Sequence, residues 1–184
     1  DRGVVWYRTE FDYVLEPGRR AFLYFGGGNF AKDVYLNGRL LARHRGGFTP
    51  FNIEVTDFLS DGRNGLVVKV DSLSEATDVP TEYNDWLNYG GLTREVRLLD
   101  VPSTFVRAYS VQLAAGRDAI EGWVELDGPG AGEGASISIP ELGIEVSVDT
   151  HAGGRGDFSA AARPQLWAPG SPKRYEVVVA GGSD

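Results

Sequence analysis

Short apolar runs, separated at close intervals by turn residues, limit what this chain can fold into more than any other feature. The 184 residues include 25 glycines and 9 prolines. Residues 4–14 alternate in polarity, with Val5, Tyr7, Phe11 and Tyr13 on one side and charged residues between them. Period-two alternation of this kind predicts a half-buried strand. A succession of such runs indicates an all-β fold.

More strands are predicted in the first half of the chain. Residues 21–25 are apolar on both faces, as in a central strand of a β-sandwich. Residues 31–36 and 39–44 are joined by Asn37-Gly38, and both of these residues tolerate the positive φ of a type I′ turn. Thr56 is expected to cap one helical turn. The remaining predicted strands of this half are 52–55, 66–70 and 95–99.

The sequence Val101-Pro102-Ser103 marks a change in the pattern of the chain. After it the alternation becomes simpler, the side chains become smaller, and glycine-rich turns separate the runs. The apolar positions of these runs are 109–113, 120–126, 137–139, 144–148 and 175–179. Regular short strands of this kind predict an immunoglobulin-like sandwich without a disulfide. We therefore expect two domains, at residues 1–102 and 103–184.

Composition excludes several classes of function. The formal net charge of -8 argues against a nucleic-acid partner, and no apolar run approaches the length of a membrane span. The absence of cysteine excludes thiol chemistry, and two histidines cannot form a multi-histidine metal site. Gly26-Gly27-Gly28 lacks the Lys-Ser or Lys-Thr of a phosphate loop. We expect no metal or other cofactor, and the cellular compartment stays open.

Two further expectations concern single features. His44 lies between two arginines and is expected at a solvated or hydrogen-bonded strand edge. The chain begins at Asp1 and contains no methionine, so we expect it to be an excised or processed piece of a longer protein.

Residues 71–92 form the longest irregular segment, and aromatic residues suggest that it is ordered and functional. An ionised carboxylate at Asp85 can accept two hydroxyl protons, and the amides of Asn84 and Asn88 add donors and acceptors. Trp86 and Tyr89 offer apolar faces. A neutral, hydroxyl-rich ring is recognised by groups of this kind. Alternatively, Trp86 and Tyr89 close one end of a sandwich while Asp85 caps a turn.

Four motifs, in this order, resemble the N-terminal sugar-binding, jelly-roll domain of family 2 glycoside hydrolases, which include β-glucuronidases and β-galactosidases. They are Trp6-Tyr7-Arg8, the run from Val34 to Gly38, the run from His44 to Phe51, and the run from Asn84 to Arg94. The resemblance covers residues 1–102 and implies a jelly-roll, galactose-binding-like β-sandwich. The second half is similar to the family's immunoglobulin-like domain, chiefly at Leu166 to Pro172.

The resemblance also implies roles for the loop residues. In the family, the aspartate that matches Asp85 reaches the active site and contacts sugar hydroxyls, with neighbours such as Trp86, Asn88 and Tyr89 supporting the loop. The Asn-Tyr-Gly-Gly sequence that begins at Asn88 is closer to the β-glucuronidase branch than to the β-galactosidases.

Retaining glycosidases need two carboxyl groups about 5–5.5 Å apart, and in this family both are glutamates of a (β/α)₈ barrel that follows the immunoglobulin-like domain. We therefore expect residues 1–184 to be catalytically silent, with carbohydrate and a C-terminal barrel of the same polypeptide as partners. Two rival interpretations stay open. One is an autonomous carbohydrate-binding module that uses Trp86, and the other is an interaction module without sugar contact.

Overall fold

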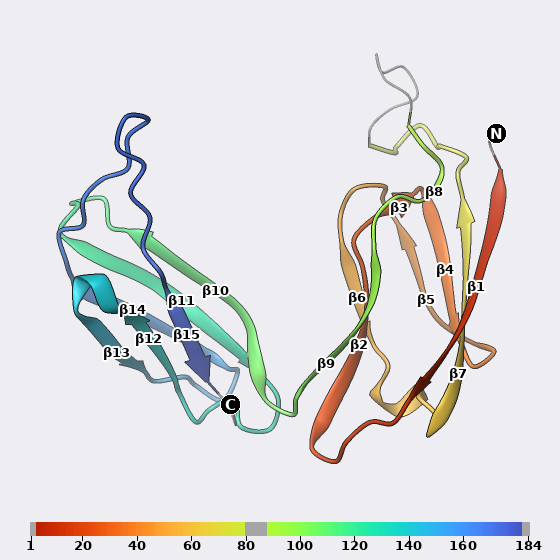
Figure 1. Ribbon diagram of the computed structural model, residues 1–184, viewed down its shortest axis with the longest axis horizontal. Coiled ribbons are helices and arrows are strands. Elements are labelled where there is room, and N and C mark those ends of the chain that lie inside the picture. The colour runs from red at the N-terminus through yellow and green to blue at the C-terminus, as the bar shows by residue number, and fades with distance from the viewer. Residues whose placement is uncertain (1–2, 80–87, 182–184) are drawn as a thin grey trace. The chain divides into compact units, whose positions relative to one another are not determined.

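The computed structural model describes residues 3–79 and 88–181, and the chain divides into two compact units, Asp1–Asp100 (unit 1) and Val101–Asp184 (unit 2). Both units are built from antiparallel strands, with only two short 3₁₀ turns among the described residues, so the all-β prediction is confirmed (Figure 1). No helix in the described ranges has the length and apolar character of a transmembrane span.

Unit 1 is a sandwich of a four-stranded sheet, in the order β1-β7-β4-β5, and a three-stranded sheet, in the order β6-β2-β9. A third, two-stranded sheet pairs β3 with β8 at one end. The strands are β1 (Val4–Tyr13), β2 (Arg19–Phe25), β3 (Gly28–Asn29), β4 (Ala31–Leu36), β5 (Arg39–Arg45), β6 (Phe51–Glu54), β7 (Gly62–Asp71), β8 (Gly91–Leu92) and β9 (Val96–Pro102), with the 3₁₀ turn η1 at Thr56–Phe58.

The core of unit 1 follows the strand period. Leu66, Val68 and Val70 of β7 all face inward and are at most 7% exposed, as the alternation predicts. The other buried members of this core are Ala21, Leu23, Phe25, Val34, Leu36 and Val55. Asn37 and Gly38 connect β4 to β5 with φ values of 53° and 81°, so both central residues have the positive φ that the type I′ hairpin requires.

Strand β1 departs from its prediction in one respect. It pairs with β7 along its whole length and its polarity alternates, but it is not half-buried. Val5 is 47% exposed and Tyr7 is 36% exposed. The physical reason is that β1 is an edge strand, and its apolar face lies beside an open space between the two sheets.

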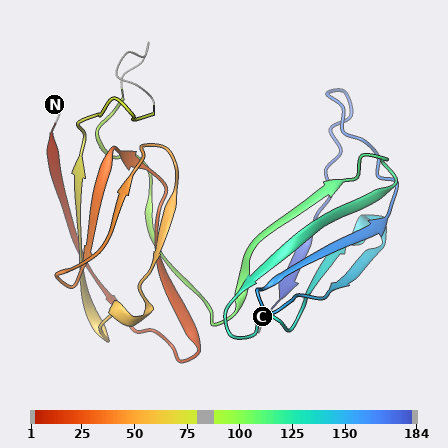
Figure 2. The same ribbon diagram turned by 180° about the vertical axis from the view of Figure 1, so that it is seen from behind.

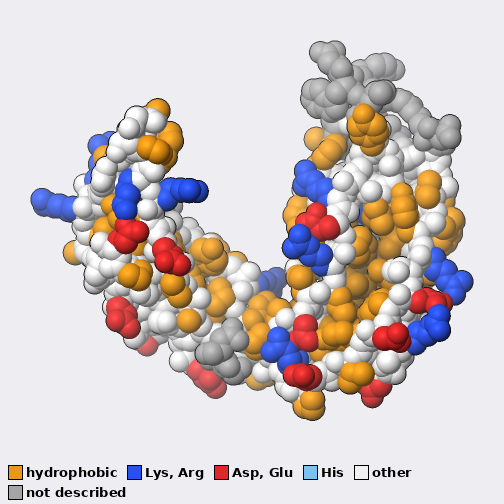
Figure 3. Space-filling view, in the orientation of Figure 1, with side chains coloured by type: hydrophobic (Ala, Val, Ile, Leu, Met, Phe, Trp, Pro, Cys, Tyr) orange, Lys and Arg blue, Asp and Glu red, His pale blue; other side chains and the backbone are white. Residues whose placement is uncertain are grey.

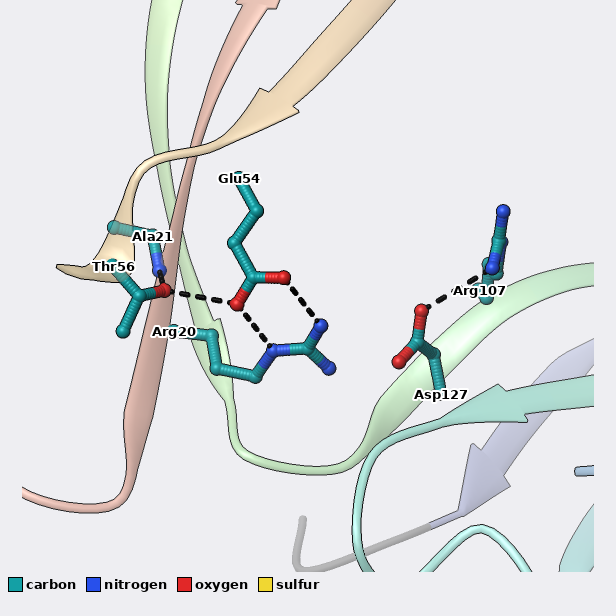
Figure 4. Close-up of polar contacts among 6 residues, drawn as sticks. All are labelled: Arg20, Ala21, Glu54, Thr56, Arg107 and Asp127. Carbon is teal, nitrogen blue, oxygen red and sulfur yellow. Dashed lines mark hydrogen bonds and ion pairs between the residues drawn. The ribbon is translucent and has the colours of Figure 1, made fainter. Parts of the chain in front are cut away.

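The side chain of Thr56 also has a different role from the one expected. The turn η1 forms, but Thr56 makes no capping hydrogen bond to it. Its hydroxyl instead accepts from the Ala21 amide at 3.1 Å and donates to Glu54 Oε1 at 3.0 Å. Arg20 donates to both oxygens of the same carboxylate, at 2.9 and 2.8 Å (Figure 4). These contacts fasten β2 to the end of β6 and to η1. The Arg20 guanidinium lowers the pKa of Glu54.

Unit 2 is a sandwich of two three-stranded sheets, in the orders β10-β11-β14 and β13-β12-β15 (Figure 2). The strands are β10 (Phe105–Leu113), β11 (Ala119–Asp127), β12 (Ala135–Ile139), β13 (Ile144–Val148), β14 (Arg155–Ala161) and β15 (Val178–Gly181), with the 3₁₀ turn η2 at Pro140–Leu142. Arg107 of β10 donates to the carboxylate of Asp127, the last residue of β11, at 3.3 Å (Figure 4). Val124 and Ile137 are completely buried between the sheets.

Because each unit has its own apolar core, we expect core truncations to destabilise one unit at a time. Leu36→Ala in unit 1 and Ile137→Ala in unit 2 should each cost about 2–5 kcal/mol through lost burial and an added cavity. Amide exchange measured by mass spectrometry should accelerate in the unit that carries the substitution. Val14→Ala at an exposed position is the control. Equal acceleration in both units for either core variant would contradict this expectation.

Candidate functional site

The irregular residues 71–92, here called the aromatic segment, connect β7 to β8. Three of the proposed sugar-contacting residues, Asn84, Asp85 and Trp86, lie outside the described residues. The other two are described: Asn88 is half-buried, and Tyr89 is 74% exposed. The structure therefore describes the two ends of the segment, where it joins the sandwich.

Asn29 fastens the end that leads into β8. Its side chain is 1% exposed, and its Nδ2 donates to the Tyr89 carbonyl at 2.8 Å. Asn29 is also paired with Gly91 in the β3–β8 ladder. Gly47 is needed beside it, because a Cβ at that position would lie 1.8 Å from Asn29 Oδ1. A buried side-chain hydrogen bond and a backbone ladder thus hold the residues that follow the undescribed part of the segment.

Tyr7 supports the same end from β1. Its hydroxyl accepts from the Leu92 amide at 3.3 Å. Gly91 has a φ of 91°, and a Cβ there would lie 2.3 Å from the Tyr7 hydroxyl. Position 91 therefore requires glycine for two reasons, the left-handed backbone and the close approach of a side chain.

Lys32 lies buried beneath this end of unit 1. It is 1% exposed, and its ammonium donates to the Gly28 carbonyl and, at 2.6 Å, to the Gly46 carbonyl. The Phe51 ring lies 5.6 Å from Nζ. Burial nevertheless lowers the pKa of Lys32 to about 8. Gly28 pairs with Leu92 in the β3–β8 ladder, and Gly46 follows β5. The Lys32 ammonium therefore links these two parts of the chain.

An ion pair fastens the other end of the segment, after β7. The guanidinium of Arg45 donates to both oxygens of Asp78, at 2.8 and 2.7 Å, and Asp78 is only 6% exposed. Asp78 Oδ2 also accepts from the Glu75 amide at 2.6 Å. The hydrogen bonds from Arg45 hold the pKa of Asp78 below its usual range, against the effect of burial. A bidentate pair of this kind fixes direction as well as distance.

His44 differs from the solvated or hydrogen-bonded edge residue that its arginine neighbours predict. Its ring stacks on Phe51 with centroids 4.0 Å apart, and its Nε2 is buried without a hydrogen-bond partner among the described residues. Burial first, and the charge of Lys32 second, lower the pKa of His44. Asn29 Oδ1 and Asn88 Oδ1 are likewise buried without a described partner. This end of unit 1 therefore contains three buried polar atoms that have no partner among the described residues.

Sequence reasoning missed the residues that anchor the segment. Arg45 and Asp78 are 33 positions apart, and Asn29 and Tyr89 are 60 apart. Nothing in their local patterns marks them as partners.

The described residues contain no group of three or more His, Cys, Asp or Glu side chains that could hold a metal ion. The described part of the site provides anchors at Asp78, through Arg45, and at Tyr89, through Asn29.

The family described as "Glycosyl hydrolases family 2, sugar binding domain" matches residues 2–102. A putative β-glucuronidase of Formosa agariphila is 35% identical over 98 residues, which are 53% of this chain and 12% of that protein. A β-galactosidase of Thermoanaerobacter pseudethanolicus is 33% identical over 111 residues, which are 58% of this chain and 15% of that protein. The chain thus spans a small part of the length of these relatives.

The fold extends the likeness to both units. The structure of Bifidobacterium dentium β-glucuronidase, complexed with coumarin-3-O-glucuronide, is similar with a TM-score of 0.80 and 25% identity. The similarity covers 96% of this chain and 36% of that one. It therefore includes unit 2, which lies beyond the matched sugar-binding domain.

The anchoring role of Asn29 can be measured. In Asn29→Ala, loss of the hydrogen bond to the Tyr89 carbonyl should destabilise this end of unit 1 by about 1 kcal/mol. Amide exchange of residues 88–92 should accelerate severalfold, while unit 2 stays unchanged. Asn52→Ala on an exposed position of β6 is the matched control. The anchor assignment would be wrong if both variants left the exchange of residues 88–92 as it is in the original protein.

Burial of Lys32 makes stability depend on pH in a defined direction. Its pKa falls from 10.5 to about 8 on folding, so between these values the unfolded chain binds more protons and stability rises with pH. Below pH 8 the cost of burying the charge is present in full. Relative to Lys32→Met, the original protein should gain on the order of 3 kcal/mol from pH 8 to 10.5. Urea unfolding at several pH values measures this, and a constant difference between the two proteins would refute it.

Proposed function

Because the chain belongs to glycosyl hydrolase family 2, whose sugar-binding domain matches residues 2–102, we propose that it is the non-catalytic N-terminal part of a retaining exo-β-glycosidase. The proposed parent enzyme is β-glucuronidase-like and hydrolyses O-glycosyl bonds. The sugar-binding jelly roll, at residues 1–102, would contain unit 1, and the immunoglobulin-like domain, at residues 103–184, would make up nearly all of unit 2. The family match carries this proposal, and the likeness of both units to a solved β-glucuronidase supports it.

The specific contribution of unit 1 is Asp85, whose carboxylate accepts hydrogen bonds from hydroxyls of the sugar. An ionised carboxylate accepts such bonds in pairs and forms them more strongly than a neutral group does. The anchors on both sides support this assignment, because Asp78 is clamped by Arg45 and the Tyr89 carbonyl is bound by Asn29. A carboxylate carried between two fixed points loses less freedom on binding substrate than one on a free loop.

Hydrolysis itself is assigned to a (β/α)₈ barrel of the same polypeptide, outside residues 1–184. A retaining enzyme needs an acid/base and a nucleophile at about 5–5.5 Å, in a site from which water is largely excluded. Unit 1 would support this barrel and complete its pocket from one side. Residues 1–184 alone would therefore bind sugar weakly and hydrolyse nothing.

One observation favours a second candidate, a carbohydrate-binding module that works without a barrel. The ring of Tyr89 is 74% exposed beside the same segment, and exposed aromatic rings can stack on the apolar face of a sugar. Calorimetric titration of residues 1–184 with glucuronate and galactose separates the two proposals. Micromolar binding that is lost in Tyr89→Ala or Trp86→Ala would favour the module, whereas undetectable binding is expected for the N-terminal part of a glycosidase.

The role of Asp85 is tested in the protein encoded by the complete gene. Asp85→Asn should lower kcat/KM for an aryl β-glucuronide by roughly 10-fold to 100-fold, because a hydrogen bond to a charged group is worth about 1.5–3 kcal/mol. Initial rates with 4-nitrophenyl β-D-glucuronide and the matching galactoside measure this and show which sugar is preferred.

Asp61→Asn is the matched control, because Asp61 is an exposed aspartate in the turn before β7, at the opposite end of that strand from the aromatic segment. It should leave kcat/KM unchanged. Full activity in Asp85→Asn would remove the assigned contact. Hydrolysis of either aryl glycoside by purified residues 1–184 would contradict the assignment of catalysis to another domain.

A further inference from the structure

The β4–β5 hairpin carries two basic side chains opposite each other on its inner face. Lys32 of β4 pairs with His44 of β5 in the ladder, and side chains at such positions have Cβ atoms about 4.5–5.5 Å apart. Figure 3 shows Lys and Arg side chains of unit 1 at its surface, where such groups are normally found. Lys32, in contrast, is 1% exposed, and His44 is half-buried with a buried Nε2. Two groups that can each carry a positive charge therefore lie side by side inside the sandwich.

Phe51 of β6, in the opposite sheet, lies against both members of this pair. Its ring centroid is 4.0 Å from that of His44, with the planes inclined by 13°, and 5.6 Å from Lys32 Nζ. A protonated imidazole donates a hydrogen bond from each ring nitrogen, but a phenyl ring has no lone pair to accept one. His44 Nε2 has no hydrogen-bond partner among the described residues. The surroundings thus suit a neutral imidazole beside one ammonium.

The described groups around the pair supply no charge that would offset a second proton. Arg43 and Arg45, on either side of His44, point away from the sandwich interior, and each pairs with a carboxylate there. The turn after β5 adds the neutral hydroxyl of Thr49. Burial, and after it the charge of Lys32, lowers the pKa of His44. Like charges directly opposite each other destabilise a ladder, so the closed pair resists a second proton.

Lys32 connects this pair to the end of unit 1 that carries the aromatic segment. Its ammonium donates to the carbonyls of Gly28 and Gly46, and Gly28 pairs with Leu92 of β8. Movement of the Lys32 side chain away from a charged His44 would break both hydrogen bonds. The β3–β8 ladder has only two residues in each strand, so it depends on this support more than the longer ladders do.

We propose that Lys32 and His44 form an acid-sensitive pair, in which uptake of a second proton by His44 separates the two side chains and opens the β3–β8 end of unit 1. The proton comes from solvent, and its release closes the pair again. The four-stranded sheet stays paired, because its core consists of apolar side chains that do not titrate. This inference does not rest on the role proposed for Asp85.

The direction of the pH dependence follows from the number of protons that each form binds. In the open form the imidazole titrates at its ordinary pKa of 6.5, whereas the closed pair holds the pKa of His44 below that value. The open form therefore binds more protons below pH 6.5, and its fraction rises as the pH falls. The rise is at most about tenfold per pH unit, and it ends when the closed form also takes up the proton.

Hydrogen exchange of residues 1–184, measured by mass spectrometry and corrected for the intrinsic rate at each pH, tests the opening. From pH 6.5 to about 5.5, opening of residues 26–29 and 88–92 should increase severalfold, up to about tenfold, while unit 2 stays unchanged. His44→Gln cannot take up the proton and should abolish the increase. His151→Gln, at an exposed position of unit 2, is the matched control and should keep it.

A second measurement follows the imidazole of His44 by NMR. In Lys32→Met the opposing charge is gone, so the midpoint of the His44 titration should rise toward 6.5. In Lys69→Met the midpoint should stay unchanged, because Lys69 pairs with Asp33 on the outer face of the same sheet.

Three results would overturn the proposal. The first is protonation of His44 without faster exchange of residues 26–29 and 88–92, because the pair would then accept a second charge without opening. The second is an acid-induced increase that persists in His44→Gln. The third is an unchanged His44 midpoint in Lys32→Met, which would show that the two groups are not coupled.

Discussion

The end of unit 1 that carries the aromatic segment depends on polar groups held inside an apolar sandwich. The Lys32 ammonium is buried and donates to two backbone carbonyls that lie 18 positions apart, Gly28 and Gly46. Burying a charge costs free energy unless it is paired or hydrogen-bonded. The two hydrogen bonds of Lys32 offset part of this cost, and they fix the positions of both carbonyls relative to each other.

The remaining contacts extend that framework to both ends of the segment. Asn29 binds the Tyr89 carbonyl after it, and Arg45 clamps Asp78 before it. Neither anchor is itself proposed as a sugar ligand. Both anchors hold described residues next to the stretch that contains Asp85. The role proposed for Asp85 requires positioning of this kind, because a binding group must be held close to its productive geometry.

The sequence pattern predicts the strands of the fold. It predicts less well which strand faces are buried and which distant residues contact each other. Leu66, Val68 and Val70 face the core as their period requires, and Asn37-Gly38 forms the expected hairpin. These features are local, so a sequence can specify them. Val5 and Tyr7 lie in the same kind of alternating pattern but are exposed. Alternation shows which face of a strand is apolar, but it does not show whether another layer covers that face. The anchors Asn29 and Asp78 could not be predicted, since their partners are distant in sequence. Asp85 is singled out by its carboxylate among amide and aromatic side chains, and the family motif gives it a specific role.

A structure of the complete protein with a bound glyconolactone inhibitor would test the role of Asp85 most directly. We predict that a carboxylate oxygen of Asp85 lies within about 2.5–3.0 Å of a sugar hydroxyl oxygen, with the Asn29 and Arg45 anchors in place on either side of the segment. An Asp85 carboxylate that points away from the sugar, beyond the reach of a hydrogen bond, would contradict this prediction. Unit 1 would then support the enzyme without contributing to its pocket.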